Sequence, residues 1–132
     1  MIAPSILRQV ILCIDDDLDQ LKLRALVLSG AGYTVLTATN AAAGLHLFMH
    51  NHVDVVVSDH LLPDAPGSDL IGEMKRLKPA VLVVLLSGLP EAPAGAEQAD
   101  LFLTKGMAVP EFLAGIAKLL NGKAKSASNV SS

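Results

Sequence analysis

Acidic side chains follow two strongly apolar stretches of the chain. Asp15, Asp16 and Asp17 come directly after a run of five apolar residues, and Asp59 ends a second, β-branched run. Two like charges 4 Å apart repel by about 4 kcal/mol at an effective dielectric constant near 20, so something must offset the repulsion between consecutive carboxylates. Bound Mg²⁺ can offset it, since this ion binds through one or two carboxylates and keeps several waters. Asp15, Asp16 and Asp59 therefore predict a Mg²⁺ site if the two runs are neighbours.

A simpler interpretation of the same acids stays open at this point. Asp17 or Asp19 is a suitable cap for a following helix, and hydration alone would then offset the repulsion. Asp59, with Pro63 behind it, is also typical of a turn.

The elements that must position these acids alternate along the chain. Apolar and β-branched runs predict strands at 10–14, 33–38, 53–59, 80–86 and 101–104, and apolar stripes predict helices at 18–29, 41–50, 69–78 and 111–121. Such alternation favours a parallel sheet with helices on both faces. All strand carboxyl ends then lie at one edge, where ligands bind in open α/β sheets.

Two further polar residues follow apolar strands in the same way. Ser87 ends the fourth predicted strand and Lys105 follows the fifth, so both join the acids at that edge. A carboxylate such as Asp59 can attack phosphorus as a nucleophile, while a hydroxyl and an ammonium group donate hydrogen bonds to the transferred phosphoryl oxygens. The five residues together predict a phosphoryl-transfer site.

Composition narrows the class of protein. The chain has 132 residues, 52% of them apolar, with a mean hydropathy of +0.50, which fits one domain around a buried sheet. No apolar run reaches the roughly 18 residues of a membrane span, and no signal peptide is visible. The net charge of -3 provides no basic surface for nucleic acid. The lone Cys13 indicates a core residue in a reducing cytoplasm.

The chain is expected to form one domain with a short extension. The domain covers residues 1–122, because the last helical pattern is followed by Gly122. Residues 123–132 are small and polar, which predicts a flexible C-terminal tail.

The sequence resembles the receiver domain of bacterial two-component response regulators over residues 8–122. The resemblance rests on the stretches LCIDDD at 12–17, VSDHLLPDAPG at 57–67, LSG at 86–88 and FLTK at 102–105. It implies an α/β fold of the flavodoxin-like type, with a doubly wound, parallel, five-stranded sheet in the order 2-1-3-4-5. Chemotaxis response regulators share this strand order.

The resemblance also implies roles for individual residues. Asp59 is the phosphoacceptor, and Mg²⁺ is held by Asp15, Asp16, Asp59 and the backbone carbonyl of Leu61. Ser87 is the switch hydroxyl that moves to the phosphoryl group.

Lys105 is the ion partner of that phosphoryl group, and Phe102 is the aromatic switch residue whose rotamer follows the hydroxyl. The implied phosphodonor is a histidine kinase or a phosphotransfer protein, while the output partner is unknown from the sequence. The implied protein catalyses only its own phosphoryl transfer and dephosphorylation and is otherwise not an enzyme. Formation of a weak homodimer is left open by the resemblance.

Two departures from the family pattern carry predictions of their own. Gly106 follows Lys105 where the family usually has proline, and a cis peptide without proline costs about 2.5 to 4 kcal/mol, so we expect a trans bond. The segment 89–99 contains Pro90, Pro93 and Gly95, which predicts a loop or at most two helical turns in place of a full fourth helix.

Two other functions remain as alternatives. A phosphatase of the haloacid dehalogenase type would use Asp15 as its nucleophile, but it needs a late acidic pair that the residues after Asp100 do not provide. A receiver-like binding module that works without phosphorylation would fit the unusual 89–99 segment.

Overall fold

A single parallel sheet forms the centre of the molecule. The computed structural model describes residues 8–131, with side chains described for residues 8–122. The strands are β1 (Val10–Ile14), β2 (Thr34–Ala38), β3 (Val55–Asp59), β4 (Leu82–Ser87) and β5 (Leu101–Thr104). Their spatial order is β2-β1-β3-β4-β5 with every pairing parallel. The predicted flavodoxin-like order is therefore confirmed.

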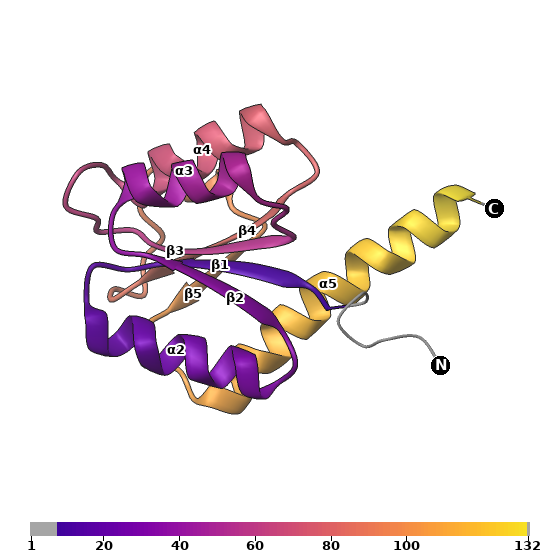
Figure 1. Ribbon diagram of the computed structural model, residues 1–132, viewed down its shortest axis with the longest axis horizontal. Coiled ribbons are helices and arrows are strands. Elements are labelled where there is room, and N and C mark those ends of the chain that lie inside the picture. Colours follow the sequence, from indigo (N-terminus) through magenta and orange to yellow (C-terminus); the bar gives the residue numbers. More distant parts are fainter. Residues whose placement is uncertain (1–7, 132) are drawn as a thin grey trace.

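Helices cover both faces of this sheet (Figure 1). α3 and α4 lie on one face, whereas α2 and α5 lie on the other. Their bounds are Leu18–Gly30 for α2, Ala41–His50 for α3, Gly67–Leu77 for α4 and Val109–Ser131 for α5. This is the doubly wound arrangement that the alternating pattern predicts.

Two apolar cores follow from the alternation of side chains along the buried strands. In β1, Leu12 and Ile14 belong to the core under α3 and α4, while Ile11 and Cys13 belong to the core under α2 and α5. Successive strand residues point to opposite faces of the sheet, and helices cover both faces, so all four side chains are fully buried. Burial raises the pKa of the Cys13 thiol to about 12, so this side chain is an inert core residue, as predicted.

The first helix begins on an acid and packs by a narrow stripe. The Asp17 carboxylate accepts hydrogen bonds from the amides of Asp19 and Gln20 at 3.1 and 3.2 Å, which confirms Asp17 as the helix cap. Leu21 and Leu28 are buried. Leu18, the first residue of the predicted apolar stripe, is 55% exposed, so the buried face of α2 begins at Leu21.

The segment between β4 and β5 contains very little helix. Its only regular element is a single 3-10 turn, η1 (Ala96–Gln98), which confirms the prediction for residues 89–99. This turn is attached to α4: the Gln98 side-chain amide donates to the carbonyl oxygen of Ser68 at 3.2 Å, and the Lys75 ammonium pairs with Asp100 at 2.8 Å. Two prolines in a short window explain why no helix forms here.

The C-terminal helix differs from the prediction. Its end was expected at Gly122, with residues 123–132 as a flexible tail, but the backbone of α5 continues to Ser131. The predicted helix end is wrong because one glycine costs a helix only about 1 kcal/mol, which the residues around it can offset. Ser132 and the side chains of residues 123–131 lie outside the described part, so the division at residue 122 and the mobility of the tail stay predictions.

Among the described residues, no helix combines the length and the apolar character that a membrane crossing requires.

Candidate functional site

The acids at the ends of β1 and β3 meet at one edge of the sheet. β1 and β3 are hydrogen-bonded neighbours, with Ile14 opposite Ser58, so Asp15 and Asp59 emerge side by side. Asp15 is fully buried and Asp59 is 4% exposed. Asp16 is exposed. One carboxylate oxygen from each of these three residues lies within 4.8 Å of the others.

This cluster has the chemistry of a site for a hard divalent cation. Mg²⁺ prefers oxygen ligands and binds through few carboxylates, and three converging carboxylate oxygens match that preference. The residues Asp15, Asp16 and Asp59, which the sequence predicted as metal ligands, are the one group of this kind in the part of the chain where side chains are described.

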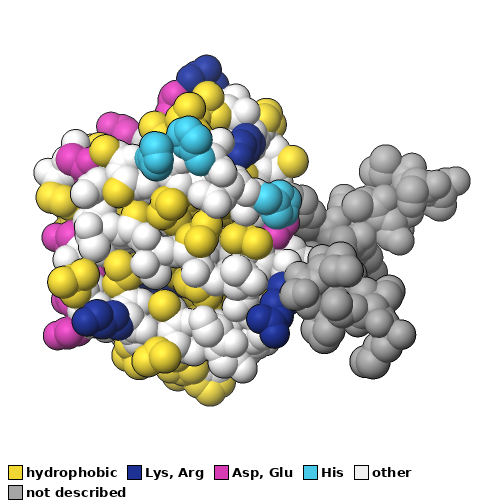
Figure 2. Space-filling model, viewed as in Figure 1, with side chains coloured by type: hydrophobic (Ala, Val, Ile, Leu, Met, Phe, Trp, Pro, Cys, Tyr) yellow, Lys and Arg dark blue, Asp and Glu magenta, His cyan; other side chains and the backbone are white. Residues whose placement is uncertain are grey.

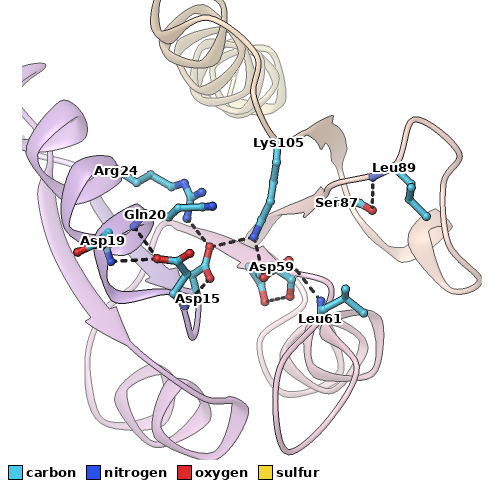
Figure 3. A network of polar contacts seen from close by, with 11 residues as sticks. Asp15, Asp19, Gln20, Arg24, Asp59, Leu61, Ser87, Leu89 and Lys105 are labelled. Carbon is cyan, nitrogen blue, oxygen red and sulfur yellow. Dashed lines mark hydrogen bonds and ion pairs between the residues drawn. The ribbon is translucent and has the colours of Figure 1, made fainter.

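Lys105 reaches this cluster from the loop between β5 and α5. Its ammonium nitrogen lies 2.9 Å from Oδ2 of Asp59 and 3.3 Å from Oδ2 of Asp15 (Figure 3). Its backbone amide donates to the carbonyl oxygen of Ser87 at 2.7 Å, which holds the loop against β4. The peptide bond to Gly106 is trans, as predicted, and Gly106 has φ 89°, a left-handed conformation that glycine adopts without strain.

Two opposing effects act on the pKa of Lys105. Partial burial removes water from the ammonium group and on its own would lower the pKa. The hydrogen bonds and negative charges of Asp59 and Asp15 outweigh this loss, so the pKa of Lys105 is raised above its usual value. Lys105 therefore stays a cation and offsets part of the negative charge of the cluster.

Arg24 is a second cation in this network, and sequence reasoning missed it. Its Nη1 lies 3.2 Å from Oδ2 of Asp15, and its side chain is 13% exposed. The signal was present in the spacing, because Arg24 stands three residues after Leu21 and four before Leu28, on the buried side of α2. A basic residue at that spacing either reaches water along its stem or pairs with a buried acid, and the structure shows the pairing with Asp15.

The predicted switch residues lie near the cluster without joining it. Ser87 ends β4 next to β3, and its hydroxyl oxygen accepts a hydrogen bond from the amide of Leu89 at 3.2 Å. Phe102, in β5, is half-buried and packs against the core under α3 and α4. Figure 3 shows the Ser87 and Leu89 pair turned away from Asp59 and Lys105.

Leu61 approaches the site by its backbone. Its amide donates to Oδ1 of Asp59 at 3.3 Å, while its side chain is 74% exposed. This contact places the Leu61 peptide beside the acid, and the use of its carbonyl as a metal ligand stays a prediction.

A glycine fixes the loop that follows Asp59. The amide of Gly67 donates to the carbonyl oxygen of His60 at 2.7 Å, and a Cβ atom at position 67 would lie 2.2 Å from the carbonyl oxygen of Asp59. Only glycine permits this close approach of α4 to the end of β3.

The same loop is anchored to the neighbouring helix by Asp64. Its carboxylate accepts hydrogen bonds from the amides of Ala41 and Ala42, at 2.7 and 2.9 Å. These bonds satisfy two donors at the start of α3 and lower the pKa of Asp64. The sequence showed Asp64 only as part of a motif, and nothing in the local spacing indicated this contact.

Histidines form a separate surface group. Figure 2 shows exposed histidine side chains on the face that carries α3. His46 and His50 are one turn apart, with ring centroids 4.3 Å from each other, and Nδ1 of His50 contacts the carbonyl oxygen of His46 at 2.8 Å. No acid of the described residues joins them in a metal-binding group, so they stand apart from the acidic site.

Comparisons with known proteins agree with this geometry. The family model of the response regulator receiver domain matches residues 11–117. The transcriptional regulatory protein GlrR of Escherichia coli is 36% identical over 99 residues, which are 72% of this chain and 22% of GlrR, so the chain spans about a fifth of that relative.

Solved structures give the same answer. A receiver domain from Clostridium thermocellum is 31% identical with a TM-score of 0.80, and the match covers 88% of this chain and 97% of that one. Response regulator TrrA from Thermotoga maritima, in complex with Mg²⁺ and BeF, is 26% identical with a TM-score of 0.80, covering 84% of this chain and 98% of that one. The chain therefore belongs to the family of response regulator receiver domains.

Proposed function

We propose that Asp59 is the phosphoacceptor of this receiver domain and that Asp15, Asp16, Asp59 and the Leu61 carbonyl hold Mg²⁺. The observation that carries the proposal is the contact of Lys105 with both Asp59 and Asp15, at 2.9 and 3.3 Å, beside three converging carboxylates. An acid that only starts a turn would need neither a lysine partner nor converging carboxylates. The Mg²⁺ and BeF complex of TrrA, a protein of the same fold, supports the proposed metal.

The proposed reaction is the transfer of one phosphoryl group to a carboxylate. An oxygen of Asp59 attacks phosphorus, the bond from phosphorus to the donor nitrogen or oxygen breaks, and the leaving group takes the electron pair. Lys105 stays protonated and donates to the oxygens of the transferred group. Bound Mg²⁺ would neutralise negative charge on those oxygens.

Signalling then follows from the charge added at Asp59. Ser87 swings toward the phosphoryl group and donates a hydrogen bond to it, and Phe102 follows. The Ser87 hydroxyl oxygen now accepts from the Leu89 amide at 3.2 Å and points away from Asp59 (Figure 3), so the side chain must rotate to bring its hydroxyl within reach. These movements would reach residues 89–100, which contain only the η1 turn.

The proposed setting is a two-component pathway. In the cytoplasm, a histidine kinase or phosphotransfer protein supplies the phosphoryl group to this domain, and a separate output partner or domain responds to the modified state. Apart from catalysing its own phosphoryl transfer and dephosphorylation, the domain is not an enzyme.

The test uses a small phosphodonor with the whole chain. Incubation with acetyl phosphate and Mg²⁺ should add about 80 Da to the protein, and reductive trapping with peptide mapping should place the modification on Asp59. Asp59→Asn should abolish the modification because the amide is a poor nucleophile of nearly the same shape. Asp69→Asn, an exposed acid in the first turn of α4, is the matched control and should be modified like the wild type.

Two outcomes would contradict the proposal. Modification of Asp15 in place of Asp59 would support the phosphatase-type alternative. A chain that is folded but not modified, with or without Mg²⁺, would support a binding module that acts without phosphorylation.

A further inference from the structure

Two cations contact the same oxygen of the Asp15 carboxylate. Oδ2 contacts Nη1 of Arg24 at 3.2 Å and Nζ of Lys105 at 3.3 Å, and Oδ1 accepts from the amide of Asp17 at 2.9 Å. The Arg24 contact is a hydrogen-bonded ion pair and the Lys105 contact is an ion pair. A divalent cation that binds Asp15 through Oδ2 would therefore compete with these two cations for the same oxygen.

Arg24 is the cation that can leave more easily. Lys105 has a second acid, Asp59, at 2.9 Å, whereas Asp15 is the single acid paired with Arg24 among the described residues. Losing Arg24 therefore breaks one ion pair, while losing Lys105 breaks two.

The structure also provides room for Arg24 to move. A hollow of about 290 Å³ lies between α2 and α5, and Arg24 and Lys105 both line it together with the apolar side chains of Leu23, Val27 and Phe112. The guanidinium can swing along this hollow without unpacking Leu21 or Leu28, because its stem can lie on apolar surface while its head reaches water.

We propose that Arg24 is a built-in competitor of Mg²⁺ for Asp15 and weakens the affinity of the site for the metal. The inference rests on the proposed function, because it concerns the same metal site. Arg24 acts on Asp15 and is a positioning residue, since it holds this carboxylate as an ion pair until the metal binds.

The charge of the cluster indicates the direction of the effect. Three carboxylates face two cations, so the site carries a formal charge of about -1 with Arg24 and about -2 without it. Removing Arg24 should therefore both take one of the two cations from Oδ2 and strengthen the attraction for a divalent cation. We expect Arg24→Met to bind Mg²⁺ about tenfold more tightly, which corresponds to ~1.4 kcal/mol.

The experiment is a calorimetric titration of the full-length chain with MgCl₂, without any phosphodonor. Three proteins are compared: the wild type, Arg24→Met, and Lys22→Met. Lys22 lies on the same helix with an exposed side chain, so its substitution removes the same charge without touching Asp15. The expected result is a tenfold gain for Arg24→Met and less than a twofold change for Lys22→Met, because salt screens exposed charges within about 10 Å.

A second variant and a second measurement keep the test valid if Arg24→Met folds poorly. Arg24→Lys keeps the charge in a shorter side chain with a single ammonium group, and it should bind Mg²⁺ with an affinity between those of the wild type and Arg24→Met. Thermal unfolding should also show a larger stabilisation by Mg²⁺ in both Arg24 variants than in the wild type.

The outcomes separate this inference from the proposed function. If the wild type binds Mg²⁺ and both Arg24 variants bind it with the same or lower affinity, the competition is overturned while the metal site stands. If Lys22→Met gains as much as Arg24→Met, only net charge matters and the inference is likewise overturned. If none of the proteins binds Mg²⁺, the proposed metal site itself fails, and this inference fails with it.

Discussion

Asp16 is the acid of the cluster whose charge has the least compensation, and its removal is the most informative single change. Asp15 and Asp59 share Lys105, and Asp15 also pairs with Arg24. Asp16 is exposed and has no ion pair with any described residue. Without metal its charge therefore opposes folding, whereas with metal it should help to hold the cation.

The magnitude follows from the separation of the carboxylates. At 4.8 Å, the outer limit for oxygens of this cluster, two like charges repel by about 0.9 kcal/mol in water and about 3.5 kcal/mol at an effective dielectric constant of 20. Asp16 is exposed, so the lower figure applies for each of its two neighbours, and the nearby cations offset part of the sum. Asp16→Asn should thus stabilise the metal-free fold by about 1 kcal/mol, which raises the melting temperature by about 3 to 5 °C.

The same substitution should reverse the effect of metal. A ligand present at 100 times its dissociation constant stabilises the native state by about 2.7 kcal/mol, so the wild type should gain several degrees when EDTA is replaced by MgCl₂. Asp16→Asn should lose most of that gain. Thermal unfolding followed by circular dichroism, with EDTA or with MgCl₂, measures both effects.

Glu91→Gln is the control, because it removes one exposed acid in the 89–100 segment. It should leave the response to Mg²⁺ unchanged. A metal-free Asp16→Asn protein that melts below the wild type would refute the repulsion argument. An undiminished gain with MgCl₂ would refute Asp16 as a metal ligand.

Two further predictions concern the surroundings of Asp59. Gly67→Ala should lower the free energy of unfolding in urea by about 3 kcal/mol, because its Cβ would meet the Asp59 carbonyl oxygen at 2.2 Å and Cα of His60 at 2.9 Å. Gly30→Ala is the control, since the space around its Cβ is open and it should cost almost nothing. Equal losses in the two variants would contradict the steric argument. The raised pKa of Lys105 stabilises the fold fully below 10.5, its unfolded value, and this contribution is lost as the pH rises through the higher folded pKa. Urea unfolding from pH 8 to 11.5 should therefore show the advantage of the wild type over Lys105→Met shrinking only at the top of that range, and a loss near pH 8 would contradict the raised pKa.

The strands and the acids at their ends could be predicted because both depend on local sequence. Continuous apolar runs mark strands buried on two faces, and β1 and β3 do contribute alternate residues to both cores. Asp15 and Asp59 then meet because parallel strands end at one edge. Lys105 could be placed at the same edge because it follows the fifth strand, and its ammonium group contacts both acids there.

The parts that the sequence did not predict depend on contacts between distant residues or on small energy differences. Asp64 accepts hydrogen bonds from the first amides of α3 although it lies 23 residues away from Ala41, and no local pattern records this contact. Arg24 is a charged residue within an apolar stripe, and only the position of Asp15 shows why it is there. The end of α5 was wrong because Gly122 shifts a helix by about 1 kcal/mol, too little to decide where the helix stops.

The contact between Asp64 and α3 makes the loop after β3 and that helix one mechanical unit. If the loop withdraws by more than hydrogen-bond reach, the amides of Ala41 and Ala42 lose their acceptors and must find water. A displacement that starts at Asp59 therefore has a second route through the molecule, toward the helix on the outer strand β2. An output partner could then sense the occupied site from the α3 side of the sheet as well as from residues 89–100.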